Sequence, residues 1–143
     1  MSALRITDLP AMQAIVDRSS FNRFLGLRIR TLDEDRLVLH MPWQEDLVSN
    51  PDLQSTHGGV LATLIDVACD YAIAARLGRA VPTIDLRVDY HRIARPGSLT
   101  VEARVLHLGG TLACAEATVA DERGQRIASG RGQYQTQAPT RAP

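Results

Sequence analysis

The chain is poor in cysteine. It contains Cys69 and Cys114, which lie far apart and match no spacing typical of a zinc site. Each falls in an apolar run, where a free thiol behaves as a small hydrophobic side chain. The pattern therefore favours two buried free thiols over a disulfide or a metal centre.

Several catalytic and ligand-binding motifs are missing. The chain has no GxxxxGK or GxGxxG segment, which argues against a nucleotide-phosphate loop. It has no GxSxG segment, so we do not expect the nucleophile elbow of a serine hydrolase. The histidines do not form an HExxH pair, and we expect neither a metal nor a separate cofactor. These histidines are His40, His57, His91 and His107.

The chain has no excess of charge of either sign. Its 16 basic and 16 acidic residues cancel, so bulk charge does not favour binding to nucleic acid or to a membrane surface. Any site for an anion must be a local cluster. No apolar run reaches the roughly 18 residues of a membrane span, and residues 1–10 lack the apolar core of a signal peptide. We therefore expect a cytoplasmic protein.

The chain does have enough apolar sequence for one core. Its 143 residues, 45% of them hydrophobic, predict a single domain over residues 1–143, with a loose tail after about residue 135. A short helix is expected over residues 8–18, with Asp8 as its N-cap and Pro10 in its first turn. Strands are expected over 25–31 and 36–41, followed by a loop over 42–56.

A long helix is expected next, over His57–Gly78, with Gly78 as its C-cap. The pattern then changes to period two, which predicts a strand through Ile84 and Tyr90 with one buried face. Turn residues separate three further strands, over 99–107, 112–120 and 125–134. This order predicts an α+β fold in which one long helix packs against a largely antiparallel sheet.

The predicted long helix carries polar residues on one face. It is apolar nearly all round, which predicts that it is buried. The exceptions are Thr63, Asp66 and Asp70, whose spacings of three and four place them together. A carboxylate on a buried helix needs a partner or a proton. Either this face touches solvent or Asp66 has a chemical role.

The helix opens with His57-Gly58-Gly59. The first turn of a helix has backbone N–H groups without intrahelical partners, and the helix dipole adds partial positive charge there. Two glycines let a ligand approach that backbone closely. The segment suits a polarised carbonyl or an oxyanion, although a tight loop-to-helix turn is the alternative.

His57-Gly58-Gly59, with Asp66 nine residues after the histidine and small residues at Ala68 and Ala72, resembles the hotdog-fold thioesterases. The PaaI-like group, which includes the phenylacetyl-CoA thioesterases, is the most similar. The resemblance covers most of the chain. It implies a long helix wrapped by the sheet, a homodimer or homotetramer whose subunits pair edge to edge, and active sites at the dimer interface. The implied reaction is hydrolysis of an acyl-CoA thioester to the free acid and CoA.

The resemblance also implies residue roles. The Gly58 N–H polarises the carbonyl, with Gly59 in the same ligand-binding turn. Asp66 of the opposite subunit acts as nucleophile or as general base on water. His57 lies near the carbonyl or the leaving thiolate, and Thr83 helps to hold the water.

One position departs from the family pattern. The family commonly has an asparagine six residues before the histidine, which helps to bind the carbonyl. Here that position is Pro51, which has no donor side chain. Asn50 is one residue away, and we assign the role to it.

The phosphates of CoA require a local basic cluster, since the whole chain is neutral. His91, Arg92 and Arg95 lie together at the end of the predicted edge strand, Thr83–Ile93. We expect them to bind the nucleotide end of CoA, and a solvated strand end is the alternative. A hotdog dehydratase and a non-catalytic acyl-CoA binder are the other functions compatible with the sequence, which leaves the acyl group unspecified.

Overall fold

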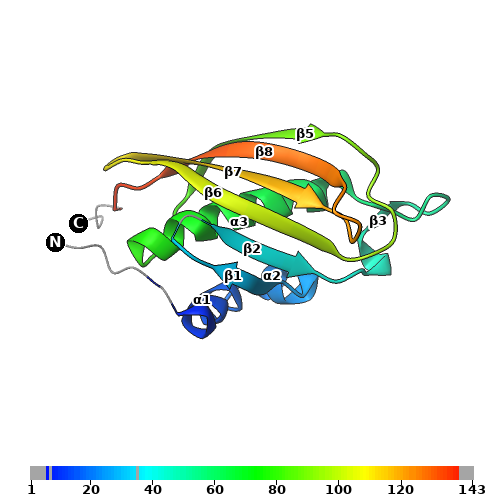
Figure 1. Cartoon of the computed structure of the whole chain (residues 1–143), viewed down its shortest axis with the longest axis horizontal. Coiled ribbons are helices and arrows are strands. Elements are labelled where there is room, and N and C mark those ends of the chain that lie inside the picture. The colour runs from blue at the N-terminus through cyan, green and yellow to red at the C-terminus, as the bar shows by residue number, and fades with distance from the viewer. Residues whose placement is uncertain (1–5, 7, 35, 139–143) are drawn as a thin grey trace.

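The computed structural model describes residues 6, 8–34 and 36–138, which form a curved sheet with one long helix against its inner face (Figure 1). The six strands of the sheet run in the order β1-β2-β6-β7-β8-β5, and every neighbouring pair is antiparallel. The helix, α3 (Gly58–Leu77), contacts β2, β5, β6, β7 and β8. The predicted α+β class and hotdog arrangement are confirmed. The strands are β1 (Arg28–Leu32), β2 (Leu37–Met41), β5 (Thr83–Tyr90), β6 (Leu99–Leu108), β7 (Leu112–Ala120) and β8 (Arg126–Gln135).

Both ends of α3 are capped, and the C-cap at Gly78 is the one that the sequence predicts. His57 is the N-cap, and its side chain accepts a hydrogen bond from the Gly59 N–H. At the other end Gly78 adopts a left-handed conformation with φ of 73° and donates its N–H to the Ala74 carbonyl. A residue with a Cβ adopts this conformation only at a cost, so Gly78 ends the helix.

The secondary structure predicted for residues 19–27 is wrong. Instead of a loop that enters a strand, Ser20–Leu25 forms a short helix, α2, which Ser19 caps and which ends at Gly26 with φ of 68°. Leu25, Leu27 and Ile29 are all buried, so alternate apolar residues mimic a strand although β1 begins only at Arg28. The preceding helix, α1 (Leu9–Val16), is capped by Asp8 as predicted.

The segment predicted as a loop over 42–56 contains local structure. A short 3-10 helix, η1 (Glu45–Leu47), leads into a small hairpin of β3 (Val48–Asn50) and β4 (Ser55–Thr56). The His57 N–H donates to the Leu47 carbonyl at 2.7 Å, and the Thr56 N–H donates to the Ala94 carbonyl at 2.9 Å. These bonds attach the start of α3 to its surroundings, which the periodicity of the sequence does not reveal.

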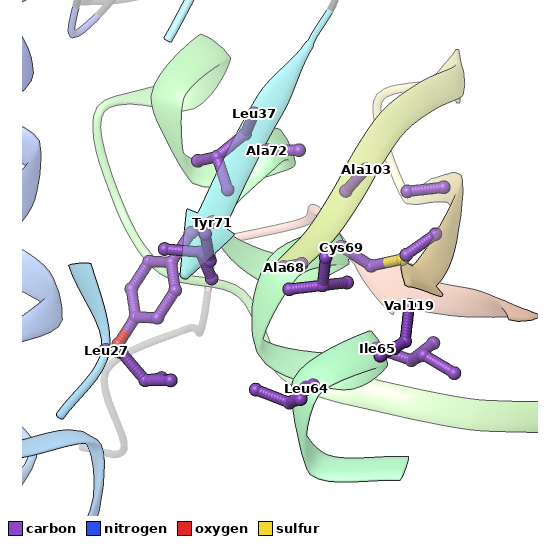
Figure 2. Close-up of a cluster of buried hydrophobic side chains, with 14 of the residues drawn as sticks. Leu27, Leu37, Leu64, Ile65, Ala68, Cys69, Tyr71, Ala72, Ala103 and Val119 are labelled. Carbon is purple, nitrogen blue, oxygen red and sulfur yellow. The ribbon is translucent and has the colours of Figure 1, made fainter. Parts of the chain in front are cut away.

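Small residues let α3 lie close to the sheet. The inward side chains of β6 and β7 include Ala103, Ala113, Ala115 and Ala117, all buried. Figure 2 shows Leu64, Ala68 and Ala72 of α3 in the cluster that also includes Ala103 and Val119. At Gly130 a Cβ would lie 2.4 Å from the Arg87 carbonyl oxygen and 2.9 Å from a methyl of Ile65. Glycine is therefore required where β8 passes under the middle of the helix.

The strand β5 lies at an edge of the sheet and pairs only with β8. Most of its side chains are exposed, including Ile84 (53%) and Tyr90 (55%). The predicted edge position is confirmed, but the strand ends at Tyr90 and not at Ile93. The buried face expected through Ile84 and Tyr90 is wrong, because both side chains are exposed at the uncovered edge. An edge with this much apolar surface is a candidate for pairing with another chain.

The two thiols and the end of the chain complete the description. Both cysteines are free as expected, but only Cys69 is buried, and Cys114 is half-buried on β7. Thr136 is buried and its hydroxyl donates to the Gly109 carbonyl at 2.7 Å. Of the tail expected to be loose, residues 139–143 lie outside the described residues. Among the described helices, none has the length and hydropathy needed to cross a membrane.

Asp70 is a half-buried carboxylate one turn after Asp66. Burial raises the pKa of Asp70 to about 6, and the nearby charge of Asp66 acts in the same direction. A hydrogen bond that Asp70 accepts from the Val81 N–H at 3.1 Å opposes the shift. Since the ordinary value is about 3.9, the folded protein binds the proton more tightly than the unfolded chain. Asp70 therefore lowers the free energy of unfolding as the pH rises through about 6.

We predict that Asp70→Asn stabilises the protein at pH 8, by about 2 kcal/mol. Asparagine can still accept the Val81 hydrogen bond and does not carry a buried charge. At pH 4 Asp70 is protonated in the folded protein and about half protonated in the unfolded chain, so the gain should largely disappear. Urea unfolding at pH 8 and pH 4 measures the difference, and an equal effect at both pH values would contradict this explanation.

Candidate active site

The side chain of His57 caps the first turn of α3. Its Nδ1 accepts the Gly59 N–H at 2.9 Å. Because Nδ1 accepts a hydrogen bond, the proton of the neutral ring lies on Nε2. The residue is exposed, and Nε2 is the ring nitrogen that does not take part in the cap. A Cβ on Gly59 would lie 3.0 Å from Nδ1, so a glycine there leaves room for the ring. Gly59, expected in the ligand-binding turn, has its own N–H occupied by His57.

The Gly58 N–H is the amide left at this helix end. Among the described residues it has no hydrogen-bond acceptor. The Tyr90 hydroxyl donates to the Gly58 carbonyl at 2.8 Å and ties the end of β5 to the start of α3. A surface pocket of about 370 Å³ adjoins this amide, and its lining includes Gly58, Leu61, Tyr90, Arg92 and Ile93. The helix dipole favours a partial negative charge in this place.

Asp66 lies in the middle of α3, where the inner face meets β5 and β8. Its Oδ1 accepts two hydrogen bonds, from the Thr83 hydroxyl at 2.8 Å and from the Tyr134 hydroxyl at 3.0 Å. In the part of the chain that the structure describes, Oδ2 accepts none. The residue is half-buried. This carboxylate is therefore oriented by two donors and retains one oxygen for chemistry.

The first turn and Asp66 are well separated within one chain. Gly58 and Asp66 are eight residues apart on a single uninterrupted helix, which corresponds to about 12 Å along its axis. A hydrogen bond to a carbonyl oxygen and an attack at its carbon each require contacts of about 3 Å. The Gly58 turn and the Asp66 carboxylate are therefore two separate places on one helix, and we refer to them as the two half-sites of the candidate active site.

A second surface pocket, of about 510 Å³, lies beside the end of β5. Its lining includes Arg92 and Arg95 and also Arg123, which comes from the turn between β7 and β8. No ion pair joins these three arginines to a described acidic residue. Because both pockets include Arg92 and Ile93 in their linings, they are neighbours.

Acidic groups also line the arginine pocket, and both are engaged by neighbours. Asp121 accepts the N–H groups of Arg123 and Gln125, each at 2.9 Å. Glu122 accepts from the N–H and hydroxyl of Ser98, which lower its pKa. The guanidinium groups thus face solvent with no carboxylate paired to them, an arrangement suited to a phosphate.

Two other predicted site residues have local partners. The Asn50 Oδ1 accepts the N–H groups of Asp52 and Leu53 at 2.9 and 3.3 Å, so it caps its own turn. No hydrogen bond connects it to His57 or Gly58 among the described residues. His91 lies within 2.7 Å of the Ser129 hydroxyl, through its Nε2. His91 lines the pocket beside Gly58, whereas Arg92 and Arg95 line the arginine pocket.

Sequence reasoning did not identify three residues near these half-sites: Tyr134, Tyr90 and Arg123. Tyr134 shares the inward phase of β8 with the buried Gly132, and this alternation was visible in the sequence. Its contact with Asp66 was not, because 68 residues separate the two. Arg123 belongs to a different turn from Arg92 and Arg95, and only the fold brings it to them. Within the described residues, no group of three or more histidine, cysteine or acidic side chains is placed to hold a metal ion.

Comparison with known proteins places the chain in a family. Residues 53–128 match the model of the thioesterase superfamily. A solved structure described as a protein from that superfamily is 48% identical, with a TM-score of 0.87, and the match covers 89% of this chain and 96% of that one. The medium/long-chain acyl-CoA thioesterase YigI of Escherichia coli is 31% identical over 130 residues, which cover 80% of this chain and 83% of YigI.

The PaaI protein of E. coli, from the phenylacetic acid degradation operon, has the same fold. It is 24% identical, with a TM-score of 0.80, over 93% of this chain and 99% of PaaI. At this identity the similarity concerns the fold alone. The family model and the two more similar proteins lead to the same conclusion: the chain belongs to the thioesterase superfamily.

Proposed function

We propose that the protein hydrolyses acyl-CoA thioesters, with Asp66 as the reacting carboxylate. The observation that supports this most directly is the geometry of Asp66, which two hydroxyl donors fix at one oxygen and leave open at the other. Membership of the thioesterase superfamily supplies the reaction class. YigI supplies the substrate class, so we propose a medium- or long-chain acyl group on CoA.

The active site forms between two subunits in this proposal. The spacing of about 12 Å between Gly58 and Asp66 along one helix supports an arrangement in which the two belong to different active sites. The exposed edge strand β5 carries Thr83 at its start and Tyr90 at its end, so it connects both half-sites. Pairing of two β5 edges would bring the half-sites of different subunits toward each other and would cover the open edge.

In the proposed reaction each half-site has a different chemical role. The Gly58 N–H and the dipole of α3 polarise the thioester carbonyl and stabilise the oxyanion that forms. Asp66 of the other subunit either attacks the carbonyl carbon or removes a proton from the attacking water. Collapse of the tetrahedral intermediate breaks the C–S bond. In the nucleophilic route this leaves a mixed anhydride between the acyl group and Asp66, which water hydrolyses to the free acid and the restored carboxylate. Because the His57 Nδ1 accepts the Gly59 N–H, its Nε2–H is the group that we propose as hydrogen-bond donor to the departing thiolate.

In this proposal CoA binds across the two neighbouring pockets. With the thioester at Gly58, the shared lining at Arg92 directs the rest of CoA toward Arg95 and Arg123. Arginine binds phosphate through two parallel N–H donors. This provides the local cluster that a chain of zero net charge requires.

We predict that Asp66→Asn lowers kcat by about 10² or more, because the amide is neither a base nor a nucleophile. Free thiol released from a panel of acyl-CoA substrates, from short to long chains and including phenylacetyl-CoA, measures the activity. The panel also separates an enzyme from a binder that does not turn over. A folded Asp66→Asn protein with near wild-type kcat would refute the assignment.

We predict that Gly58→Pro lowers kcat by about 10² to 10³, the effect of losing one oxyanion donor. Gly58 is the first residue of the helix, where proline is well tolerated. His57 has φ of −58° and ψ of 133°, which suits a residue before proline. The substitution therefore removes the N–H with little change to the backbone.

Gly58→Ala is the matched control, since it keeps the N–H and adds a Cβ at 3.4 Å from the Tyr90 ring, an ordinary contact. Its kcat should stay within a few-fold of wild type. Equal losses in the proline and alanine variants would show that space, and not the N–H, matters at this position.

We predict that Arg92→Ala combined with Arg95→Ala raises the KM for acyl-CoA about fivefold and leaves kcat little changed, because uniform binding is lost. The increase should largely vanish with an acyl-pantetheine thioester, which lacks the nucleotide. Arg104→Ala with Arg131→Ala removes the same charge from exposed positions elsewhere on the sheet and serves as control. A defect of the same size with acyl-pantetheine would show that Arg92 and Arg95 do not bind the CoA phosphates.

A further inference from the structure

Two donors from different strands converge on the same oxygen of Asp66. Thr83 reaches Oδ1 from the edge strand β5, and Tyr134 reaches it from β8, the neighbouring strand. A carboxylate with one hydrogen bond can rotate and exchange its two oxygens. With two donors on Oδ1 and none from the described residues on Oδ2, this rotation breaks both bonds at once.

The two donors differ in how firmly they are held. Thr83 is exposed at the edge of the sheet, whereas Tyr134 is completely buried beneath α3. A Cβ on Gly132 would lie 2.5 Å from the Tyr134 ring, so β8 carries a glycine where the ring needs space. The tyrosine side chain is thus fixed by packing, and its hydroxyl is a more rigid donor than that of Thr83.

Tyr134 remains a neutral donor under ordinary conditions. Burial raises its pKa far above the usual range, and the charge of Asp66 acts in the same direction. The Cys69 thiol, which makes a hydrogen bond with Tyr134, also has a pKa raised by burial, to about 12. Both groups keep their protons, and neither competes with Asp66 as a base.

We propose that Tyr134 is a positioning residue, whose hydroxyl fixes the rotation of the Asp66 carboxylate so that Oδ2 is the oxygen that reacts. This inference rests on the proposed role of Asp66 in thioester hydrolysis. Tyr134 does not touch the substrate and acts through the carboxylate that it orients. Thr83 supports the same orientation from the exposed side.

A purely structural role for the hydroxyl is the competing explanation. A buried tyrosine hydroxyl needs an acceptor, and the Tyr134 hydroxyl lies 3.2 Å from the Asp66 main-chain oxygen as well as 3.0 Å from Oδ1. If the main-chain oxygen were the acceptor that matters, loss of the hydroxyl would change stability alone. The two explanations differ in their effect on catalysis.

Tyr134→Phe removes the hydroxyl and keeps the ring. We expect kcat to fall about tenfold with KM unchanged within twofold, because a misplaced reacting group affects the chemical step. A crystal structure of the variant should show the Asp66 carboxylate rotated away from its wild-type orientation.

Tyr71→Phe is the matched control. Tyr71 is also buried, lies on α3, and its hydroxyl accepts a hydrogen bond from the Asn22 side chain at 3.0 Å. Loss of either hydroxyl should lower the thermal midpoint, but Tyr71→Phe should leave kcat unchanged. An unrotated carboxylate, or a Tyr134→Phe enzyme with the kinetics of Tyr71→Phe, would overturn the positioning role. Retained activity in Asp66→Asn would instead overturn the proposed function, so the two failures are distinguishable.

Discussion

The rigid spacing along α3 determines how this protein can work. The helix runs without interruption from Gly58 to Leu77, so the amide at its start and the carboxylate of Asp66 are held about 12 Å apart. The edge strand β5 contacts both positions through Tyr90 and Thr83, and no described strand pairs with its outer side. The composite site that we propose, made by two chains, is consistent with both observations.

The residues of the sheet that pack against α3 are small. Alanine on β6 and β7 and glycine on β8 remove the side chains that would hold α3 away from the sheet. Close approach at Gly130 and Gly132 brings the Tyr134 hydroxyl within hydrogen-bonding distance of Asp66. This hydrogen bond fixes the orientation of the carboxylate. One turn further on, Asp70 accepts a hydrogen bond from the Val81 N–H, its one hydrogen-bond partner among the described residues. The two acids lie on the same face of the helix and differ in the donors that reach them.

Much of this fold could be predicted from the sequence, because the spacing of hydrophobic residues indicates which face of a helix or strand is buried. The extent of the long helix and its cap at Gly78 follow from local patterns, whereas the edge position of β5 was expected from the resemblance to a family whose subunits pair edge to edge. Residues 19–27 were predicted wrongly because a short helix and a strand can bury the same alternate leucines. Local patterns also gave no sign of Tyr134 and Arg123, whose partners are distant in the chain and come together only through the pairing of strands and turns.

Subunit complementation tests the composite site most directly. Asp66→Asn and Gly58→Pro chains carrying different affinity tags can be produced together and their heterodimer purified. In the heterodimer one site carries both lesions and the other carries none, so we expect about half of the wild-type kcat per dimer although each homodimer is nearly inactive. If both half-sites acted within one chain, every site in the heterodimer would carry a lesion. A heterodimer as inactive as its parents would therefore contradict a site shared between subunits.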